Sequence, residues 1–181
     1  MTQTDYRTET RELQQELEQN IGGEVRFDQM SKTIYSTDAS IYQIEPIGVV
    51  LPRNRDDVVA IIETARKYGI SILPRGAGTS LAGQTVGQSL VIDFSKYMNK
   101  VIELNQEEEW VRIQPGIVLD ELNHRLRPYN VLFAPDPSTS NRGNVGGAIG
   151  NNSCGSHSVK WGKTIDHTLE LDTVLTNGET H

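Results

Sequence analysis

Two glycine-rich segments hold the residues of this sequence that are best suited to bind an anionic ligand. The first spans residues 74–83 (Pro-Arg-Gly-Ala-Gly-Thr-Ser-Leu-Ala-Gly) and directly follows an apolar run at residues 70–73. Glycines and small residues let the main chain curl closely, so that successive N–H groups point inward and form an anion-binding concavity. A pyrophosphate would fit such a curl, although an ordinary flexible surface loop has the same composition.

The second segment spans residues 135–155 and follows a short apolar run at residues 131–133. It has a polar first half, the Gly146-Gly147 pair and a run of small residues up to Gly155. Loops longer than about 12–15 residues without structure of their own are usually functional or disordered, and the spaced glycines favour a binding loop. Two such segments predict one extended ligand.

Common nucleotide and metal motifs do not account for these segments. Gly76-x-Gly78 would need a third glycine where Leu81 stands, and no clear helix follows, so a Rossmann dinucleotide motif is disfavoured. The four histidines and Cys154 share no zinc-ligand spacing, and we therefore expect no metal site.

The elements that must position both segments follow from apolar periodicity and from turn residues. Helices are predicted at residues 8–20, 58–65 and 118–126, and strands at 48–51, 70–73, 90–94, 101–104, 110–114, 131–133 and 169–176. The first helix is expected to be exposed and amphipathic. The last strand enters an Asn177-Gly178 turn, whose return strand we expect to be absent from the chain. The predicted fold class is α+β, not doubly wound.

Composition excludes several classes of protein. The formal net charge of −7 disfavours sequence-independent binding to nucleic acid, which needs a clustered positive surface. The single cysteine, Cys154, excludes an internal disulfide and a multi-cysteine metal or iron–sulfur site within these residues. We expect a cytoplasmic location, since no apolar run is typical of a signal peptide or of a transmembrane segment.

The two segments together resemble the PCMH-type FAD-binding domain of the vanillyl-alcohol-oxidase flavoproteins, the FAD-linked oxidases. Residues 74–83, 135–138 and 145–155 carry the resemblance, which is closest to D-lactate, glycolate and 2-hydroxyglutarate dehydrogenases. It extends to residues 35–40 (Tyr-Ser-Thr-Asp-Ala-Ser), 161–162 and 169–178. The resemblance implies two small α/β subdomains with the cofactor between them, truncated before the substrate domain. Residues 1–33 would form an N-terminal helix and lead-in, and residues 34–181 a C-terminally incomplete FAD-binding domain.

The resemblance also implies which residues contact FAD. They are Pro74, Arg75, Gly76, Ala77, Gly78, Thr79, Ser80 and Gly83 in the first segment, Asp136, Pro137, Ser138, Gly146, Gly147, Gly150, Asn152, Ser153 and Gly155 in the second, and Val174 near the end of the chain. Main-chain N–H groups of residues 75–80 would cradle the pyrophosphate, residues 136–138 would lie beside the flavin and ribityl chain, and Val174 would contact the adenine. We expect FAD to bind non-covalently, because Thr79 stands where covalently linked relatives place a histidine. Cys154 is expected to pack beside the cofactor, and Arg142 to face either a flavin phosphate or solvent.

The function that the resemblance implies is an FAD-dependent oxidoreductase, a dehydrogenase or oxidase acting on CH–OH groups. It would oxidise a small 2-hydroxy acid by hydride transfer to flavin N5. The catalytic residues are unknown, since an absent C-terminal domain would supply the substrate pocket, and the chain alone is expected to be inactive. The electron acceptor stays open among a quinone, a cytochrome and a fused iron–sulfur module. A non-catalytic flavin- or nucleotide-binding subunit and a different reaction in the same fold stay as alternatives.

Overall fold

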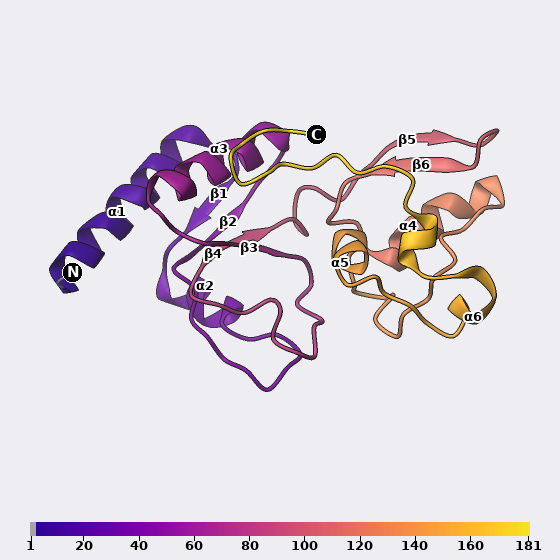
Figure 1. Cartoon of the computed structure of the whole chain (residues 1–181), viewed down its shortest axis with the longest axis horizontal. Helices are drawn as coiled ribbons and strands as arrows, with labels where there is room; N and C mark the ends of the chain where they lie inside the picture. The colour runs from indigo at the N-terminus through magenta and orange to yellow at the C-terminus, as the bar shows by residue number, and fades with distance from the viewer. Residues whose placement is uncertain (1–2) are drawn as a thin grey trace. The chain divides into compact units, whose positions relative to one another are not determined.

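The chain folds into two units, each with a sheet and helices of its own (Figure 1). The computed structural model describes residues 3–181. Unit 1 comprises the described residues up to Asp93 together with Asp172–His181, and unit 2 comprises Phe94–Leu171. Among the described residues, no helix has the length and apolar character needed to cross a membrane.

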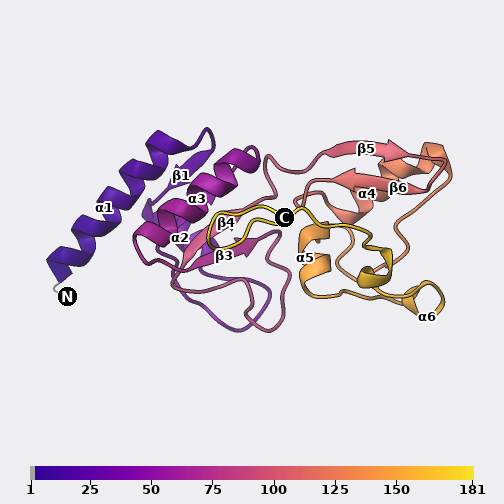
Figure 2. The same ribbon diagram turned by 45° about the horizontal axis from the view of Figure 1, so that its top comes forward.

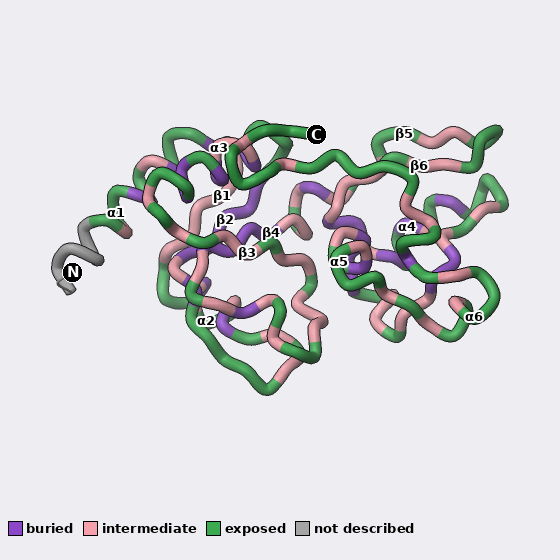
Figure 3. The backbone as a smooth tube through the Cα atoms, viewed as in Figure 1, coloured by how far each residue is buried: buried purple, intermediate pink, exposed green. Residues whose placement is uncertain are grey.

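A four-stranded sheet with strand order β1-β2-β4-β3 organises unit 1. Strands β2, β4 and β3 run parallel, and β1 pairs with β2 in the antiparallel sense at one edge. All residues of β2 and β4 are buried, as expected for parallel strands that are covered on both faces (Figure 3). The elements of this unit are α1 (Gln3–Asn20), β1 (Glu24–Arg26), α2 (Gln29–Tyr35), β2 (Gly48–Leu51), α3 (Arg55–Lys67), β3 (Ile72–Arg75) and β4 (Leu90–Asp93).

Helix α3 makes the crossover from β2 to β3, with β4 placed between these two strands. The side chain of Asn54 caps the helix by accepting a hydrogen bond from the N–H of Asp57 at 2.9 Å. The apolar face of α3 is buried, and α1 packs beside α3 (Figure 2). Leu13 and Leu17 of α1 are fully buried, so α1 is amphipathic as predicted but is not merely an exposed helix.

Unit 2 combines an antiparallel pair of strands with short helices around a second apolar core. Its elements are β5 (Val101–Asn105), β6 (Trp110–Ile113), α4 (Leu119–Leu126), η1 (Arg127–Tyr129), α5 (Val145–Gly150), α6 (Ser158–Trp161) and η2 (Thr164–His167). Ile117, three leucines of α4, and Val145 and Ala148 of α5 form the buried cluster. Helix α5 lies within the second glycine-rich segment, and its packing against α4 in this core holds the segment in place.

The structure departs from the predicted elements in unit 2 at two places. The strand predicted at residues 131–133 does not form. The side-chain amide of Asn123 instead accepts from the Phe133 N–H at 2.8 Å and donates to the Phe133 carbonyl at 3.1 Å, which replaces a strand partner. The second glycine-rich segment is also not a pure loop, because α5 forms within it.

Unit 1 differs from prediction at the ends of two strands. Strand β3 runs through Pro74 to Arg75, which an edge strand tolerates because the missing proline N–H faces away from the ladder. The prediction of an absent return strand after Asn177-Gly178 was wrong. Thr173 and His181 exchange two main-chain hydrogen bonds of 2.7 and 3.0 Å, so the turn returns within the chain, although no regular strand forms before it.

Candidate functional site

The first glycine-rich segment leaves the sheet of unit 1 at the carboxyl ends of its parallel strands. Strand β3 ends at Arg75 and β4 ends at Asp93, and these two residues are partners in the parallel register. Ligands of open α/β sheets bind outside this edge, where loops between strands and helices meet. The loop that follows Arg75 is therefore placed where a ligand is expected.

A run of main-chain donors lies in this loop. The N–H groups of residues 77–81 donate to no acceptor within the described chain, and the Thr79 hydroxyl likewise has no partner there. Gly78 and Gly83 have φ values of +66° and +76°, a region that glycine adopts without strain. Such a curl of unsatisfied N–H groups fits an anionic group.

The loop rests on the segment that follows α2. The Gly78 carbonyl accepts from the N–H of Ala39 at 3.0 Å. The Asp38 carboxylate accepts from the Thr85 hydroxyl at 2.9 Å. Burial raises the pKa of Asp38, but hydrogen bonds from Ser40 and Thr85 outweigh burial and hold that pKa below its usual value. The carboxylate therefore fastens the far end of the loop.

Asp136 fastens the two ends of the second glycine-rich segment together. Its carboxylate accepts from the main-chain N–H of His157 at 2.8 Å and from the Ser156 hydroxyl at 3.1 Å, and lies 3.2 Å from His157 Nδ1. A Cβ atom on Gly155 would lie 1.9 Å from the Asp136 carbonyl oxygen, so only glycine fits there. The side chain of Asp136 therefore has an internal structural role.

Three glycines of α5 differ in what surrounds them. Gly146 lies against Pro115, to whose carbonyl its N–H donates at 2.8 Å. Gly147 and Gly150 have no atom within 4 Å of an added Cβ. Glycine inside a helix costs about 0.5–1 kcal/mol relative to alanine, and no contact within the described chain requires it at these two positions. Three residues apart, they form one open face of the helix, which we call the glycine face.

The comparison with known proteins agrees with this geometry. Residues 46–181 match the family model described as "FAD binding domain". The chain belongs to this family of FAD-binding domains. The unsatisfied N–H groups of the first loop and the glycine face both fit such a cofactor, because the first can bind a pyrophosphate and the second permits close approach of a flat group.

Relatives of this FAD-binding domain are longer proteins. D-2-hydroxyglutarate dehydrogenase from Pseudomonas putida is 43% identical over 160 residues, covering 87% of this chain and 16% of the relative. Glycolate oxidase subunit GlcD from Bacillus subtilis is 33% identical over 175 residues, covering 94% and 37%. A solved structure of alkyldihydroxyacetonephosphate synthase matches with a TM-score of 0.84 at 25% identity, covering 93% and 37%. These matches confirm the resemblance to vanillyl-alcohol-oxidase-type flavoproteins, the α+β FAD-binding fold and FAD as the cofactor.

The predicted FAD contacts fall into two groups, one in each unit. Residues 74–83 and Val174 lie in unit 1, where Val174 bridges to Thr180 in the C-terminal turn. The others lie in unit 2. Besides Asp136 and Gly146, two more of them make internal bonds that involve distant residues: Asn152 Oδ1 accepts from the N–H of Ile165 at 3.0 Å, and the Ser153 carbonyl accepts from the Thr164 hydroxyl at 2.7 Å.

Other residues of the second segment were missed or differ from expectation. Asn144, at the N-terminus of α5, is buried and donates to the Gly116 carbonyl, and its Oδ1 has no partner in the described chain. An asparagine before an apolar run is a helix-start signal that could have found it. Cys154 and Arg142 are both exposed, and the Arg142 guanidinium donates to the side-chain oxygen of Asn141. The place of Cys154 beside the cofactor stays a prediction.

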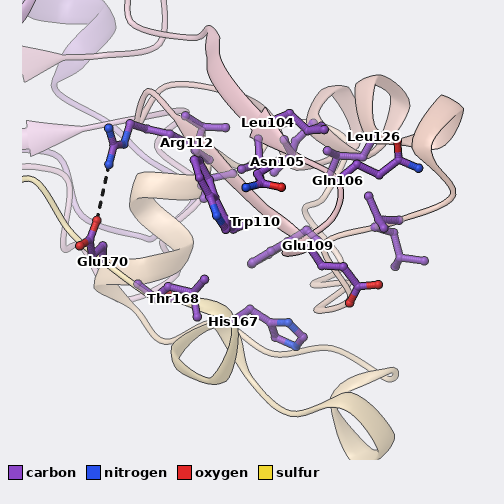
Figure 4. A pocket seen from close by; sticks show the side chains of 18 of the residues that line it. Leu104, Asn105, Gln106, Glu109, Trp110, Arg112, Leu126, His167, Thr168 and Glu170 are labelled. Carbon is purple, nitrogen blue, oxygen red and sulfur yellow. Dashed lines mark ion pairs between the residues drawn. The ribbon is translucent and has the colours of Figure 1, made fainter.

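A pocket of about 640 Å³ lies in unit 2, and none of the predicted FAD contacts is among the residues that line it (Figure 4). It is lined by residues of β5, β6, α4, α5 and η2, and it reaches the buried Leu122 and Leu126. An ion pair of 3.5 Å between Arg112 and Glu170 lies on one side of it. Since the predicted FAD contacts do not line it, this pocket is an opening in the apolar core of unit 2, not the candidate site.

Replacing Asp136 with asparagine is expected to lower the free energy of unfolding of unit 2 at pH 7. The main-chain N–H of His157 is the largest of the interactions that lower the pKa of Asp136. Because folding lowers this pKa, the carboxylate stabilises the fold above the unfolded-state value of about 3.9, and the contribution is lost as the pH falls through the lower folded-state value. The deficit of the variant should therefore shrink on acidification.

Urea unfolding followed by tryptophan fluorescence measures the free energy of unfolding of unit 2, since both tryptophans, Trp110 and Trp161, lie in that unit. The matched control is Glu107→Gln in the same unit, because the side chain of the exposed Glu107 makes no hydrogen bond in the described chain. A deficit that stays constant from pH 7 to pH 3 would show that the Asp136 carboxylate does not fasten the segment.

Proposed function

We propose that the protein carrying this FAD-binding domain is an FAD-dependent dehydrogenase that oxidises a 2-hydroxy acid. The 43% identity to a D-2-hydroxyglutarate dehydrogenase over 160 residues is the observation that favours this activity. The donor-rich first loop supports the cofactor part of the proposal independently. When bound, FAD would supply the acceptor for the hydride on the α-carbon of the substrate.

The residues of this chain would bind and orient the cofactor and not the substrate. The N–H groups of residues 77–81 and the Thr79 hydroxyl are proposed to hold the pyrophosphate, and the glycine face to admit the cofactor close to α5. Asp136 would act indirectly, by closing the second segment. The remaining contacts predicted from the sequence are proposed as main-chain contacts, because the side chains of Arg75, Ser80 and Asn152 have internal partners.

Further parts of the proposal concern the whole protein. The binding is proposed to be non-covalent, since Thr79 cannot form the histidyl link of covalent relatives. Residues 34–181 are proposed as this chain's share of the FAD-binding domain, with residues 1–33 as lead-in. A cytoplasmic location is proposed, and the electron acceptor stays among the quinone, cytochrome and iron–sulfur candidates.

Visible spectroscopy of the full-length protein is the experiment that tests this proposal. We expect flavin absorption after reconstitution with FAD and desalting, and we expect acid precipitation to release the colour because no covalent bond holds it. D-2-hydroxyglutarate, D-lactate or glycolate should then bleach the flavin band under anaerobic conditions, and L-2-hydroxyglutarate serves as the control. A colourless protein would overturn the cofactor assignment. A flavoprotein that none of these acids reduces would favour the non-catalytic subunit.

A further inference from the structure

The side chain of Arg75 joins three separate stretches of main chain at the base of the first loop. One guanidinium nitrogen, Nη1, donates to the carbonyls of Tyr35 at 3.1 Å and Thr85 at 2.8 Å. The other, Nη2, donates to the carbonyl of Thr37 at 2.7 Å. The acceptors belong to the end of α2, to the segment directly after it and to the far end of the loop, so a single side chain connects these parts to β3.

Arg75 is itself anchored to the rigid edge of the sheet. Its guanidinium lies over the ring of Tyr35, 5.2 Å from the ring centroid. The Tyr35 hydroxyl donates to the carboxylate of Asp93 at 2.5 Å, and Asp93 is the buried last residue of β4. The guanidinium is thus held between the ends of two neighbouring parallel strands and an aromatic ring.

The loop passes directly over this guanidinium. A Cβ atom on Gly78 would lie 2.6 Å from Arg75 Nη2, and Gly78 has the positive φ that turns the loop. The Gly78 carbonyl accepts from Ala39, whose segment Arg75 also holds through Thr37. Arg75 therefore lies beneath the residues whose N–H groups are free to bind an anion.

We propose that Arg75 is a positioning residue whose side chain holds the first loop in its anion-binding conformation before FAD binds. This rests on the proposed function, in which residues 77–81 bind the pyrophosphate. A lysine keeps the charge but cannot reproduce the planar fork that reaches three carbonyls from two nitrogens. The guanidinium acts through the main chain and does not need to touch the phosphates.

The test compares Arg75→Lys and Arg75→Gln with wild type in the full-length protein. Hydrogen exchange is measured by mass spectrometry without FAD, on peptides that cover residues 35–40 and 76–86. The dissociation constant for FAD is measured by quenching of flavin fluorescence. We expect faster exchange in both peptides and about tenfold or weaker FAD binding for both variants, because charged hydrogen bonds to three carbonyls are lost. Arg125→Gln is the matched control, because Arg125 lies on the exposed side of α4 and pairs with Glu121 alone among the described residues.

Each result decides the proposal. Weaker FAD binding with unchanged exchange overturns it, because Arg75 would then act on the cofactor directly. Faster exchange with unchanged affinity also overturns it. If Arg75→Gln fails to fold, Arg75→Lys decides by the same two measurements. If wild type binds no FAD, the proposed function fails instead, and exchange in the FAD-free protein still shows whether Arg75 holds the loop.

Discussion

Alanine in place of Gly155 is expected to lower the free energy of unfolding of unit 2 by about 3 kcal/mol, the upper end for overpacking a folded site. The new Cβ would lie 1.9 Å from the Asp136 carbonyl oxygen and 2.3 Å from the carbonyl carbon. Both are main-chain atoms, so no side-chain rotation relieves the overlap. The second segment would have to separate from Asp136 and lose the hydrogen bonds that close it.

Urea unfolding at pH 7, followed by the fluorescence of Trp110 and Trp161, gives the measurement. Gly150→Ala is the matched control in the same unit, since no atom lies within 4 Å of its added Cβ. A loss for Gly155→Ala of less than about 0.5 kcal/mol, the usual range for neutral surface substitutions, would show that the main chain can give way here.

The elements with a complete local signal could be predicted from the sequence. Helix α3 has a capping asparagine, acidic residues in its first turn and a regular apolar face, and all three features appear in the structure. Strands β2 and β4 are short apolar runs, and both are fully buried. In these elements local preference and tertiary packing agree, so the pattern of apolar residues is sufficient to predict them.

The elements that depend on distant partners could not be predicted. Helix α5 contains three glycines among six residues, a composition that disfavours a helix, and it forms because Val145 and Ala148 are buried in the core of unit 2. Residues 131–133 have a strand-like composition, but the amide of Asn123 satisfies Phe133 and no strand pairs with them. In both places tertiary contacts override local propensity.

The candidate site also contains features that have a local sequence signal and features that depend on distant contacts. The positive φ of Gly78 and Gly83 follows from the type of residue, whereas the FAD contacts of both segments stay predictions. The role of the Arg75 side chain could not be read from the motif, because its acceptor Tyr35 lies 40 residues earlier in the chain. Contacts between main-chain segments that are distant in sequence leave no periodic signal.

Gly147→Ala is expected to stabilise the FAD-free protein and to weaken FAD binding. Gly147 is exposed, has no positive φ and has no atom within 4 Å of an added Cβ. Alanine should therefore raise the free energy of unfolding by about 0.5–1 kcal/mol through helix propensity alone. If the cofactor approaches the glycine face closely, a methyl group there costs about 1–3 kcal/mol of binding, which is roughly a 5-fold to 150-fold loss of affinity.

The opposite signs make this variant informative, because a substitution that only damaged the fold would lower both quantities. Unfolding of the FAD-free protein and quenching of flavin fluorescence measure the two effects on one sample. Gly22→Ala, in unit 1 and outside the predicted contacts, should leave the affinity unchanged. A stabilised Gly147→Ala that binds FAD as tightly as wild type would remove the glycine face from the site. The two exposed glycines of α5 would then have no explanation in cofactor binding, and the first loop would be the remaining structural support for the proposed FAD contacts.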